Sequence, residues 1–447
     1  MKHIDTLIFA DWIIPVEPKH TVLQHHGIAI DQGKIIAIEP AEQLSQQFSA
    51  RHSHTLGQHV LIPGLINLHT HAAMSLMRGL ADDIPLMDWL KGHIWPAEQK
   101  WVHDDFVADG TLLACAEMQR AGVTCFADMY FFPEAAAEAC STAGMRAALG
   151  MVVIDFPTRY ANDPDDYLHH GLALRDAQKD NPLLSFCLAP HAPYTVSDAT
   201  FGKIATYAAQ LDLPIHIHVH ETAQEIADSI AQHGLRPLQR LQNLGLLSPG
   251  LLMAHAVHLS DEEIAVLARE GVNIAHCPTS NLKLASGIAP VYAMQQAGIN
   301  IGLGTDGAAS NNRLDLLAEM RLAALLAKGS SGFAEALPAH EVLSMATINA
   351  AKALGLAERT GSLVPGKAAD IVAINLDTPE TRPCFDPLSH LIYAAGREHV
   401  SQVWINGRQV IHDRQPTWIS QTELHTLAAR WQVRLAPHHL GGLRTED

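Results

Sequence analysis

Two histidines separated by one residue are the first pattern in the chain that indicates chemistry. His69 and His71 lie in the sequence LHTHA, at the end of an apolar run that begins at Val60. Side chains alternate in an extended strand, so these two imidazoles would point to the same side of the chain. Because neutral imidazole is a common metal ligand, the spacing predicts two ligands of one metal ion. A hydrophobic strand that ends in polar loop residues is the alternative interpretation.

Other apolar runs also end in residues that could bind a metal or transfer a proton. His191, His218, His255 and Asp306 each follow such a run, and Glu221 comes shortly after His218. A catalytic zinc-type ion takes nitrogen and oxygen ligands and leaves one coordination position for water. We predict that the metal ligands are His69, His71, His218 and Asp306.

Three histidines alternate in the segment IHIHVHE, so their side chains would share one face of a regular strand. We favour His218 as the ligand because Glu221 then follows where the strand turns into its helix. His216 lies deeper in the strand and is expected in the core or behind the ligands. The spacing leaves His220 open as a competing ligand.

The elements that must position these residues alternate between strand and helix. Amphipathic helical segments, several of which end in glycine, separate eight apolar strand candidates. This rhythm predicts an α/β fold, a parallel (β/α)8 barrel of the TIM type, with a doubly wound open sheet as the alternative. Functional residues of such barrels lie at the carboxyl ends of the strands, where the candidates fall. The strand candidates are 60–69, 123–129, 145–153, 183–191, 213–221, 251–258, 271–278 and 299–307.

Both ends of the chain differ from this pattern. Residues 1–58 and 362–447 contain short, glycine-punctuated β-like segments, and a closing helix is expected within 422–434. We predict that these two parts form one small β-sandwich domain and that the barrel, residues 59–361, is inserted between them.

Composition excludes several classes of protein. The chain has 447 residues, of which 48% are hydrophobic and 17% charged, and a formal net charge of −17, which argues against a nucleic-acid partner. We expect neither a signal peptide nor a membrane-spanning helix, because the sequence has no signal-peptide pattern and no apolar run long enough to cross a bilayer. Six cysteines without a CxxC pair predict neither a disulfide framework nor a structural zinc site. We expect a cytoplasmic protein that does not bind a membrane. The sequence leaves open whether the chain forms a homo-oligomer.

Four motifs now carry a family resemblance. LHTHAAM, IHVHET, AHAVHL and GTDGAASNN resemble, in this order, the amidohydrolase superfamily and its branch of aminohydrolases that act on aromatic ring amines. PGLINLHTHAAMSLMRGLADDIPLMDWL, PAEQ and GSLVPGKAADIV are similar to 5'-methylthioadenosine/S-adenosylhomocysteine deaminases. The resemblance implies a hydrolase that converts the 6-amino group of an adenine nucleoside thioether, or of adenosine, to the inosine form and releases ammonia. Deaminases or dechlorinases of guanine or s-triazine rings share much of the pattern, and an inactive barrel acting as a binding protein is a third alternative.

The resemblance also implies roles in catalysis. One divalent ion, Zn²⁺ by preference, would lower the pKa of its water from about 15.7 to near 7. Asp306 would be ligand and base with help from His255, and Glu221 would protonate the ring nitrogen beside the attacked carbon. The fourth barrel strand ends in Ala-Pro-His without the lysine that bridges two metals in other superfamily members, which favours one metal.

Substrate contacts are implied for five residues. Glu98 would bind the ribose hydroxyls, His191 would reach the ring, and Arg159 would meet a carboxylate at the far end; Glu221 and Asp306 would also touch the substrate. For Glu98 and His191, ordinary loop positions are the alternatives. Some family members carry another arginine in the third strand, where this chain is apolar. That difference favours methylthioadenosine, whose methylthio group would lie in an apolar pocket lined by Met151 or Phe156.

Overall fold

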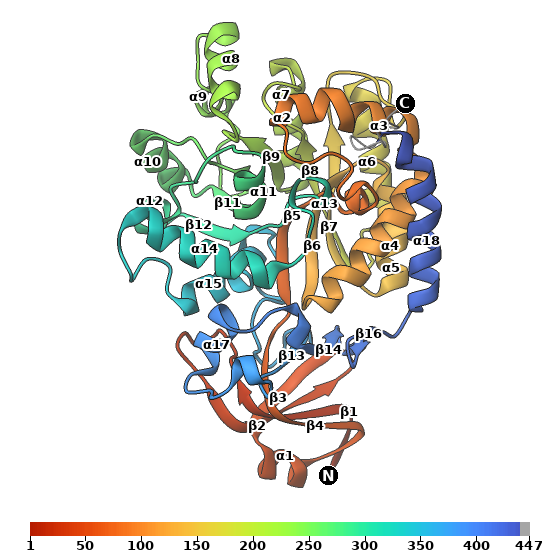
Figure 1. Cartoon of the computed structure of the whole chain (residues 1–447), viewed down its shortest axis with the longest axis vertical. Helices are drawn as coiled ribbons and strands as arrows, with labels where there is room; N and C mark the ends of the chain where they lie inside the picture. The colour runs from red at the N-terminus through yellow and green to blue at the C-terminus, as the bar shows by residue number, and fades with distance from the viewer. Residues whose placement is uncertain (439–447) are drawn as a thin grey trace, which may run out of the picture.

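The computed structural model describes residues 1–438, which form two eight-stranded sheets. In Figure 1 one sheet forms the barrel in the upper part of the molecule and the other lies below it. The barrel strands pair in sequence order and all pairs are parallel. The barrel strands are β5 Leu65–Thr70, β6 Val123–Tyr130, β7 Arg146–Val153, β8 Leu184–Pro190, β9 Ile215–Val219, β10 Leu251–His255, β11 Asn273–His276 and β12 Asn300–Leu303.

The first and last barrel strands meet and nearly close the sheet. The backbone N–H of Asp306, just after β12, donates to the carbonyl of His69 in β5 at 2.9 Å. In a doubly wound open sheet the two edge strands would not contact each other. The (β/α)8 barrel predicted from the sequence is therefore confirmed, and its strands are buried on both faces, as their continuous apolar runs require.

Helices cover the outside of the barrel and begin and end at the expected signals. At α10, Ser260 and Glu263 form a capping box, and Gly271 ends the helix at φ 70°. The helices that follow the barrel strands include α4 Asp104–Arg120, α5 Pro133–Ala143, α6 Pro164–Gln178, α7 Asp198–Leu211, α8 Ala223–His233, α9 Pro237–Asn243, α10 Asp261–Glu270, α11 Pro278–Lys283, α12 Val291–Gln296, α13 Ala308–Asn311, α14 Leu316–Ser331, α15 Ala339–Met345 and α16 Ile348–Ala353.

The small sheet is built from both ends of the chain, as predicted. Its strand order is β16-β15-β14-β13-β4-β1-β2-β3, and the N-terminal strand β4 pairs antiparallel with the C-terminal strand β13. The sheet curls around a shared core that contains Ile28, Leu61 and Trp404. Its strands are β1 Lys2–Ile13, β2 Leu23–Asp31, β3 Lys34–Pro40, β4 Phe48–Pro63, β13 Ile371–Asn375, β14 Val400–Ile405, β15 Arg408–His412 and β16 Gln415–Pro416. Helix α1 Ala41–Gln47 packs against β2, β3 and β4, whereas α17 Pro387–Tyr393 packs against α14 and α15. The domain limits at 58/59 and 361/362 stay a prediction.

The apolar run 60–69, expected to be one strand, is two strands in two sheets. β4 ends at Pro63 in the small sheet, and β5 starts at Leu65 in the barrel. Gly64 lies between them, where an added Cβ would come within 1.9 Å of the Thr124 hydroxyl, so only glycine allows the chain to pass. The Gly64 N–H donates to the carbonyl of Asp370, whose carboxylate forms a buried ion pair with Arg146 of the barrel.

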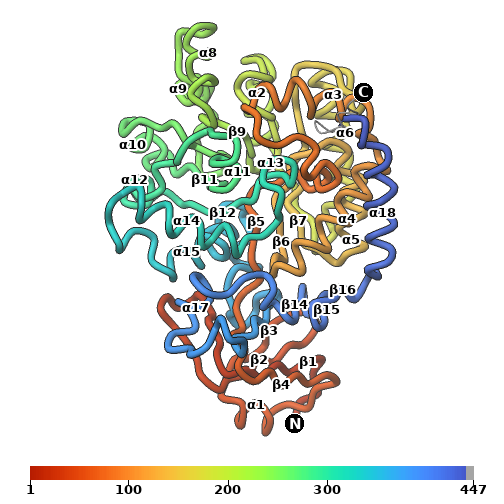
Figure 2. The backbone as a smooth tube through the Cα atoms, viewed as in Figure 1, coloured from red at the N-terminus to blue at the C-terminus, as the bar shows by residue number. Residues whose placement is uncertain are grey.

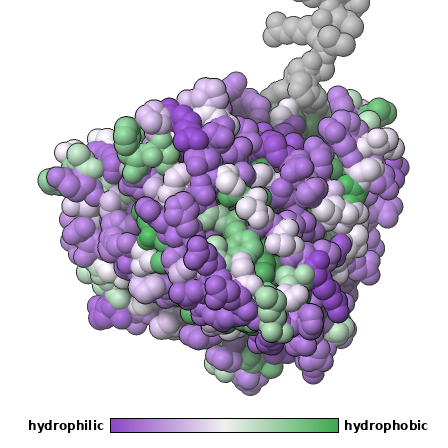
Figure 3. Space-filling model, turned by 90° about the horizontal axis from the view of Figure 1, so that it is seen from below, coloured by the Kyte–Doolittle hydropathy of each residue, from purple (hydrophilic) through white to green (hydrophobic). Residues whose placement is uncertain are grey.

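The predicted closing helix is α18, Gln421–Leu435, which lies along the barrel beside α4 in Figures 1 and 2. Trp431 is fully buried there, and its Nε1 donates to Asp109 at 2.6 Å. The face in Figure 3 is mostly hydrophilic, with a short band of hydrophobic residues near its centre. Within residues 1–438, no helix combines the length and apolar character needed to cross a bilayer.

Candidate active site

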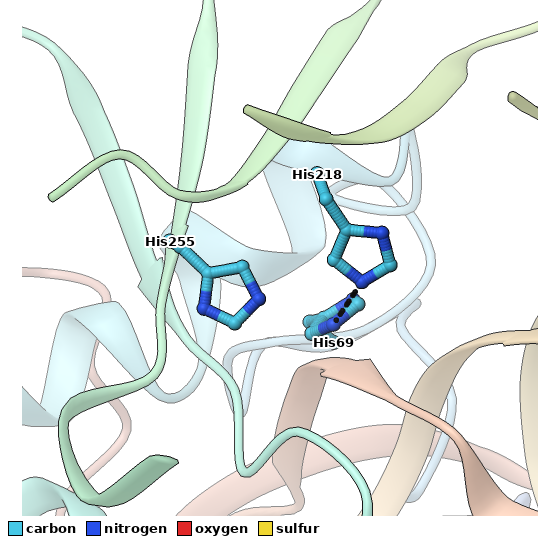
Figure 4. A group of neighbouring side chains, drawn as sticks. All are labelled: His69, His218 and His255. Atoms are coloured by element: carbon cyan, nitrogen blue, oxygen red, sulfur yellow. Dashed lines mark hydrogen bonds between the residues drawn. The ribbon is translucent and has the colours of Figure 1, made fainter. Parts of the chain in front are cut away.

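Four of the predicted residues converge at the carboxyl end of the barrel. His69 and His71 come from β5, His218 from β9, and Asp306 from the loop after β12. The Nε2 atom of His218 lies 3.2 Å from that of His69 and 3.3 Å from that of His71. Asp306 Oδ1 lies 3.5 Å from His69 Nε2 and 3.3 Å from His71 Nε2. Figure 4 shows His69 and His218 pointing toward one another from opposite sides of the site.

These distances fit the donor set of a zinc-type ion. A tetrahedral site with ligand bonds of about 2.0–2.1 Å has edges of about 3.3 Å between ligand atoms. The separations of His69 and His71 from His218 and from Asp306, 3.2–3.5 Å, match that edge. Three imidazoles and a carboxylate are also the ligand types that zinc prefers.

Hydrogen bonds on the other ring nitrogens orient the three histidines. His71 Nδ1 donates to the Met129 carbonyl at 2.6 Å, and His218 Nδ1 donates to the His191 carbonyl at 2.7 Å. His69 Nδ1 lies 2.9 Å from His216 Nε2. A carbonyl can only accept, so His71 and His218 carry the proton on Nδ1, which leaves a lone pair on Nε2 that can bind a metal. His216, expected in the core or behind the ligands, is buried behind His69.

His220 is turned away from the other histidines. Its backbone φ of 58° breaks the alternation of the strand, which the sequence pattern alone could not reveal. The His220 Nε2 atom accepts a hydrogen bond from the Leu238 N–H at 3.2 Å, outside the ligand group. Of the three alternating histidines, His218 is therefore the one whose Nε2 lies beside the Nε2 atoms of both His69 and His71.

Asp306 is fixed by two hydroxyl groups. Ser280 and Ser310 donate to its Oδ2 atom at 2.6 and 2.8 Å, while Oδ1 faces the histidines. The residue is buried and has a φ of 61°, which is unusual for a residue with a side chain. Backbone in this region is often found where surrounding contacts hold a functional side chain.

Glu221 and His255 face the same space. Their closest atoms, His255 Nε2 and Glu221 Oε2, lie 3.8 Å apart, and Asn281 Oδ1 lies 2.8 Å from His255 Nδ1. Burial raises the pKa of Glu221, and the nearby Asp306 carboxylate adds to this although His255 opposes it. The carboxyl can therefore hold a proton at a higher pH than a solvated glutamate. A nitrogen of His255 also lies within 4.8 Å of a nitrogen of His69 and of His218. Figure 4 shows the three rings as neighbours.

A cavity of about 750 Å³ opens above these residues. Its floor includes His71, His218, Glu221 and Asp306, and most of its walls are apolar or aromatic. One wall is the segment formed by α2 Leu86–Trp89, the π-helical turn Leu90–Ile94 and α3 Trp95–Trp101. A pocket of this size and character is typical of a small-molecule site.

Glu98 projects from this wall and is half-buried. The Tyr130 hydroxyl donates to its Oε1 atom at 2.8 Å. Burial raises the pKa of Glu98 to about 7, although the hydrogen bond from Tyr130 opposes the shift. A carboxyl group that lines a cavity in this way can accept hydrogen bonds from a ligand hydroxyl.

His191 and Arg159 lie at different depths of the cavity. His191 Nδ1 lies 3.0 Å from the Thr195 hydroxyl, and burial lowers the pKa of His191 to about 3, so its ring is neutral. Arg159 is exposed and donates to the Lys100 carbonyl at 2.6 Å. The sequence therefore placed both residues at the cavity, one inside and one at its edge.

The apolar lining differs in one residue from the expectation. Phe156 lines the cavity, together with Val152 and Ile154, but Met151 does not. Side chains alternate along β7, and Met151 points outward, where an added Cβ on Gly171 of α6 would meet it at 2.6 Å.

Sequence reasoning missed three residues that shape the site. Glu225 accepts hydrogen bonds from the backbone of Glu221, Tyr130 holds Glu98, and Ser280 holds Asp306. The TxxE pattern before Glu225 is visible in the sequence but predicts only a helix cap. Tyr130 and Ser280 have no local signal, because their partners are distant in the chain.

Comparison with known proteins identifies the family. Residues 60–410 match the model of the Amidohydrolase family. A 5-methylthioadenosine/S-adenosylhomocysteine deaminase from Teredinibacter turnerae is 48% identical over 97% of this chain and 98% of its own length. A 5'-deoxyadenosine deaminase from Methanosarcina mazei is 42% identical over 92% of this chain and 93% of its own.

Two crystal structures show the same fold with zinc. An adenosine deaminase from Xanthomonas campestris with bound zinc superposes with a TM-score of 0.96 at 46% identity, covering 97% of this chain and 99% of that one. The atrazine chlorohydrolase from Arthrobacter aurescens, complexed with zinc, gives 0.88 at 27% identity, covering 95% and 99%. With the ligand geometry described above, the site fits a divalent metal of the zinc type. The chain belongs to the amidohydrolase family and, within it, to the 5-methylthioadenosine/S-adenosylhomocysteine deaminases, which are hydrolases acting on C–N bonds.

Proposed function

We propose that this protein hydrolyses the 6-amino group of an adenine nucleoside that carries a 5'-thioether, with methylthioadenosine as the preferred substrate. The observation that supports the proposal most is that the four candidate metal ligands and the two candidate proton-transfer residues lie at the same cavity. His69 and His71 place their Nε2 atoms 3.2–3.5 Å from His218 Nε2 and Asp306 Oδ1, and Glu221 and His255 face the same space. The names of the relatives support the same reaction.

We infer that these four residues hold one Zn²⁺ per chain. When bound, a divalent ion of this kind makes a water oxygen nucleophilic at neutral pH. The fourth barrel strand supplies no lysine that could bridge a second ion. His255 does not join the four ligands in this proposal, because its Nδ1 contacts Asn281 and its Nε2 faces Glu221.

The protein side chains then move protons. Asp306 accepts a proton from the attacking water, with His255 beside it, while its Oδ2 stays fixed by two serines. Glu221 gives a proton to the ring nitrogen next to C6 when oxygen adds to that carbon, so negative charge does not build up in the ring. Asp306 then gives the proton it accepted to the amino nitrogen, and the C6–N bond breaks to release ammonia. The remaining hydroxyl proton returns to Glu221, which leaves the 6-oxo product. The raised pKa of Glu221 suits a proton donor.

The cavity supports a nucleoside with an apolar 5' end. Glu98 would accept hydrogen bonds from the ribose hydroxyls, and the neutral His191 ring would contact the base. Val152, Ile154 and Phe156 give the wall an apolar surface that suits a methylthio group. Arg159, at the edge, would meet the carboxylate of S-adenosylhomocysteine.

A substrate panel tests the proposal. The zinc-loaded protein should release ammonia from methylthioadenosine with a higher kcat/KM than from adenosine, guanine or an amino-s-triazine. Chloride release from a chlorinated triazine would instead favour the chemistry of the Arthrobacter relative. If every thioether nucleoside is left intact, the proposal is wrong; if no substrate reacts although zinc is bound, the inactive barrel is favoured.

A further inference from the structure

The carboxylate of Glu225 holds the backbone from which Glu221 projects. Its Oε1 atom accepts the N–H of His220 at 3.0 Å, and its Oε2 atom accepts the N–H of Glu221 at 2.8 Å. Glu225 is in the first turn of α8 and is buried. It does not line the cavity, so it can act only through its neighbours.

The turn that Glu225 holds is conformationally unfavourable. His220 has a φ of 58°, a backbone conformation that residues other than glycine rarely adopt. Its carbonyl accepts the N–H groups of Val257 and His258 at 2.9 and 3.1 Å, just after His255. One turn therefore links the backbone next to Glu221 with the backbone next to His255.

The contacts of Glu225 differ from those of an ordinary helix-capping glutamate. The cap of α8 is already made by Thr222, whose hydroxyl accepts the Glu225 N–H at 3.1 Å. In α10 the equivalent glutamate, Glu263, reaches back to the N-cap N–H of Ser260 at 2.9 Å. Glu225 instead reaches past its own N-cap to the two residues before it.

We propose that Glu225 is a positioning residue for deamination, which sets the orientation of Glu221 relative to His255 by fixing the turn at His220. The inference rests on the proposed function, in which Glu221 is the proton donor. A general acid must lie within hydrogen-bonding reach of the atom it protonates, so a small rotation of this backbone lowers the rate. Substrate binding depends on Glu98 and the apolar wall and is unaffected.

The test compares Glu225→Gln with Glu423→Gln, which changes the glutamate of the capping box at α18 away from the cavity, in the zinc-loaded full chain. A glutamine at 225 can accept only one of the two N–H groups and turns its own NH₂ toward the other. We expect kcat for methylthioadenosine to fall on the order of 100-fold, with KM and zinc content within about 2-fold of the unchanged protein. Glu423→Gln should leave kcat within about 2-fold, because glutamine can also close a capping box and this helix is remote from Glu221. An unchanged kcat in Glu225→Gln, or equal losses in both variants, would overturn the inference.

A second comparison shows whether Glu225 acts through Glu221. In a chain that already carries Glu221→Gln, adding Glu225→Gln should change the residual kcat by less than about 3-fold, because residues acting as a unit are not additive. A further loss of about 100-fold would contradict the inference. If Glu225→Gln does not fold, Glu225→Asp, which keeps the charge but cannot span both N–H groups, takes its place with the same expected results. Normal turnover by Glu221→Gln alone would overturn the proposed proton donor, whereas normal turnover by Glu225→Gln beside an inactive Glu221→Gln overturns only this inference.

Discussion

The hydroxyl of Tyr130 donates to Glu98 at 2.8 Å and so ties the helical wall above the cavity to the end of β6. One partner lies in α3 and the other in a barrel strand, so the bond fixes the wall as well as the carboxylate. If Glu98 binds the ribose, Tyr130 sets where the sugar lies. This relationship leads to the first of five predictions.

Replacing Tyr130 with phenylalanine should weaken substrate binding and spare the chemical step. Loss of a hydrogen bond to a carboxylate is worth about 1.5–3 kcal/mol, so KM for methylthioadenosine should rise by at least about tenfold. Steady-state kinetics would measure this, with kcat within about 3-fold. Tyr207→Phe is a control, since Tyr207 lies in α7 and does not line the cavity. A fall in kcat at unchanged KM would contradict the assignment.

Metal content should depend on the four ligands. Elemental analysis of the purified protein should give about one zinc-like ion per chain, and His218→Ala or Asp306→Ala should lose most of it. His220→Asn should retain the ion, because the His220 ring bonds Leu238 outside the group. Asparagine also tolerates the positive φ at that position. Two ions per chain, or loss of the ion in His220→Asn, would refute the proposed ligand set.

Replacing Glu221, the proposed proton donor, should lower kcat without changing the zinc content. Glu221→Gln keeps the size of the side chain and does not touch the four ligands, so zinc content should stay at its normal level. Its kcat should fall by about 10²–10⁴-fold, the usual contribution of a positioned general acid. Parallel zinc analysis and ammonia release would measure both quantities, and normal turnover would assign the proton transfer to another group.

Arg159 should affect substrate choice more than rate. Its guanidinium lies at the edge of the cavity, where under the proposed function it would meet the carboxylate of S-adenosylhomocysteine. Arg159→Ala should lower kcat/KM for S-adenosylhomocysteine by about tenfold, through loss of a charge-assisted bond, and change that for methylthioadenosine less than about 2-fold. Competition between the two substrates is the direct measurement. An equal effect on both would exclude Arg159 from carboxylate recognition.

Stability should depend on pH through Glu319. Burial raises the pKa of this carboxyl to about 7 from a usual 4.5, against the hydrogen bonds from Thr279 and Asn311. Between these two values the folded state holds a proton that the unfolded state has lost. The free energy of unfolding therefore falls as pH rises through this window, by up to about 1.4 kcal/mol per pH unit.

Urea unfolding of the unchanged protein and of Glu319→Gln at several pH values isolates this effect. From about pH 4.5 to about pH 7, the free energy of unfolding of Glu319→Gln should rise relative to that of the unchanged protein. Above that range the difference between the two free energies should be constant. A pH-independent difference would show that the Glu319 pKa is not raised in the folded state.

The barrel was predictable because it depends on local signals. Continuous apolar strands, glycine-ended helices and polar residues at strand ends appear in the sequence without knowledge of distant contacts. The family resemblance then supplied the reaction class, which the comparisons confirm. His69 and His71 needed only the alternation of an extended strand.

Features that depend on a backbone turn or on a distant partner were not predictable. The break at Gly64 follows from its contact with Thr124, and the rotation of His220 follows from its positive φ. Met151 was expected at the cavity, but the register of β7 places Val152 there instead. Periodicity gives the spacing of side chains along a strand and does not specify which face the first one occupies.

The passage of the chain through Gly64 has a consequence for folding. The strand that carries His69 begins directly after β4, and β4 is flanked on one edge by β13 from the far end of the sequence. During synthesis, the first metal ligands leave the ribosome long before residues 371–375 can pair beside β4. Pairing between such distant segments is slow. A nascent chain that stops before Asp370 lacks the carbonyl to which the Gly64 N–H donates, so this edge of β4, just before the strand of His69 and His71, has no partner until β13 is made.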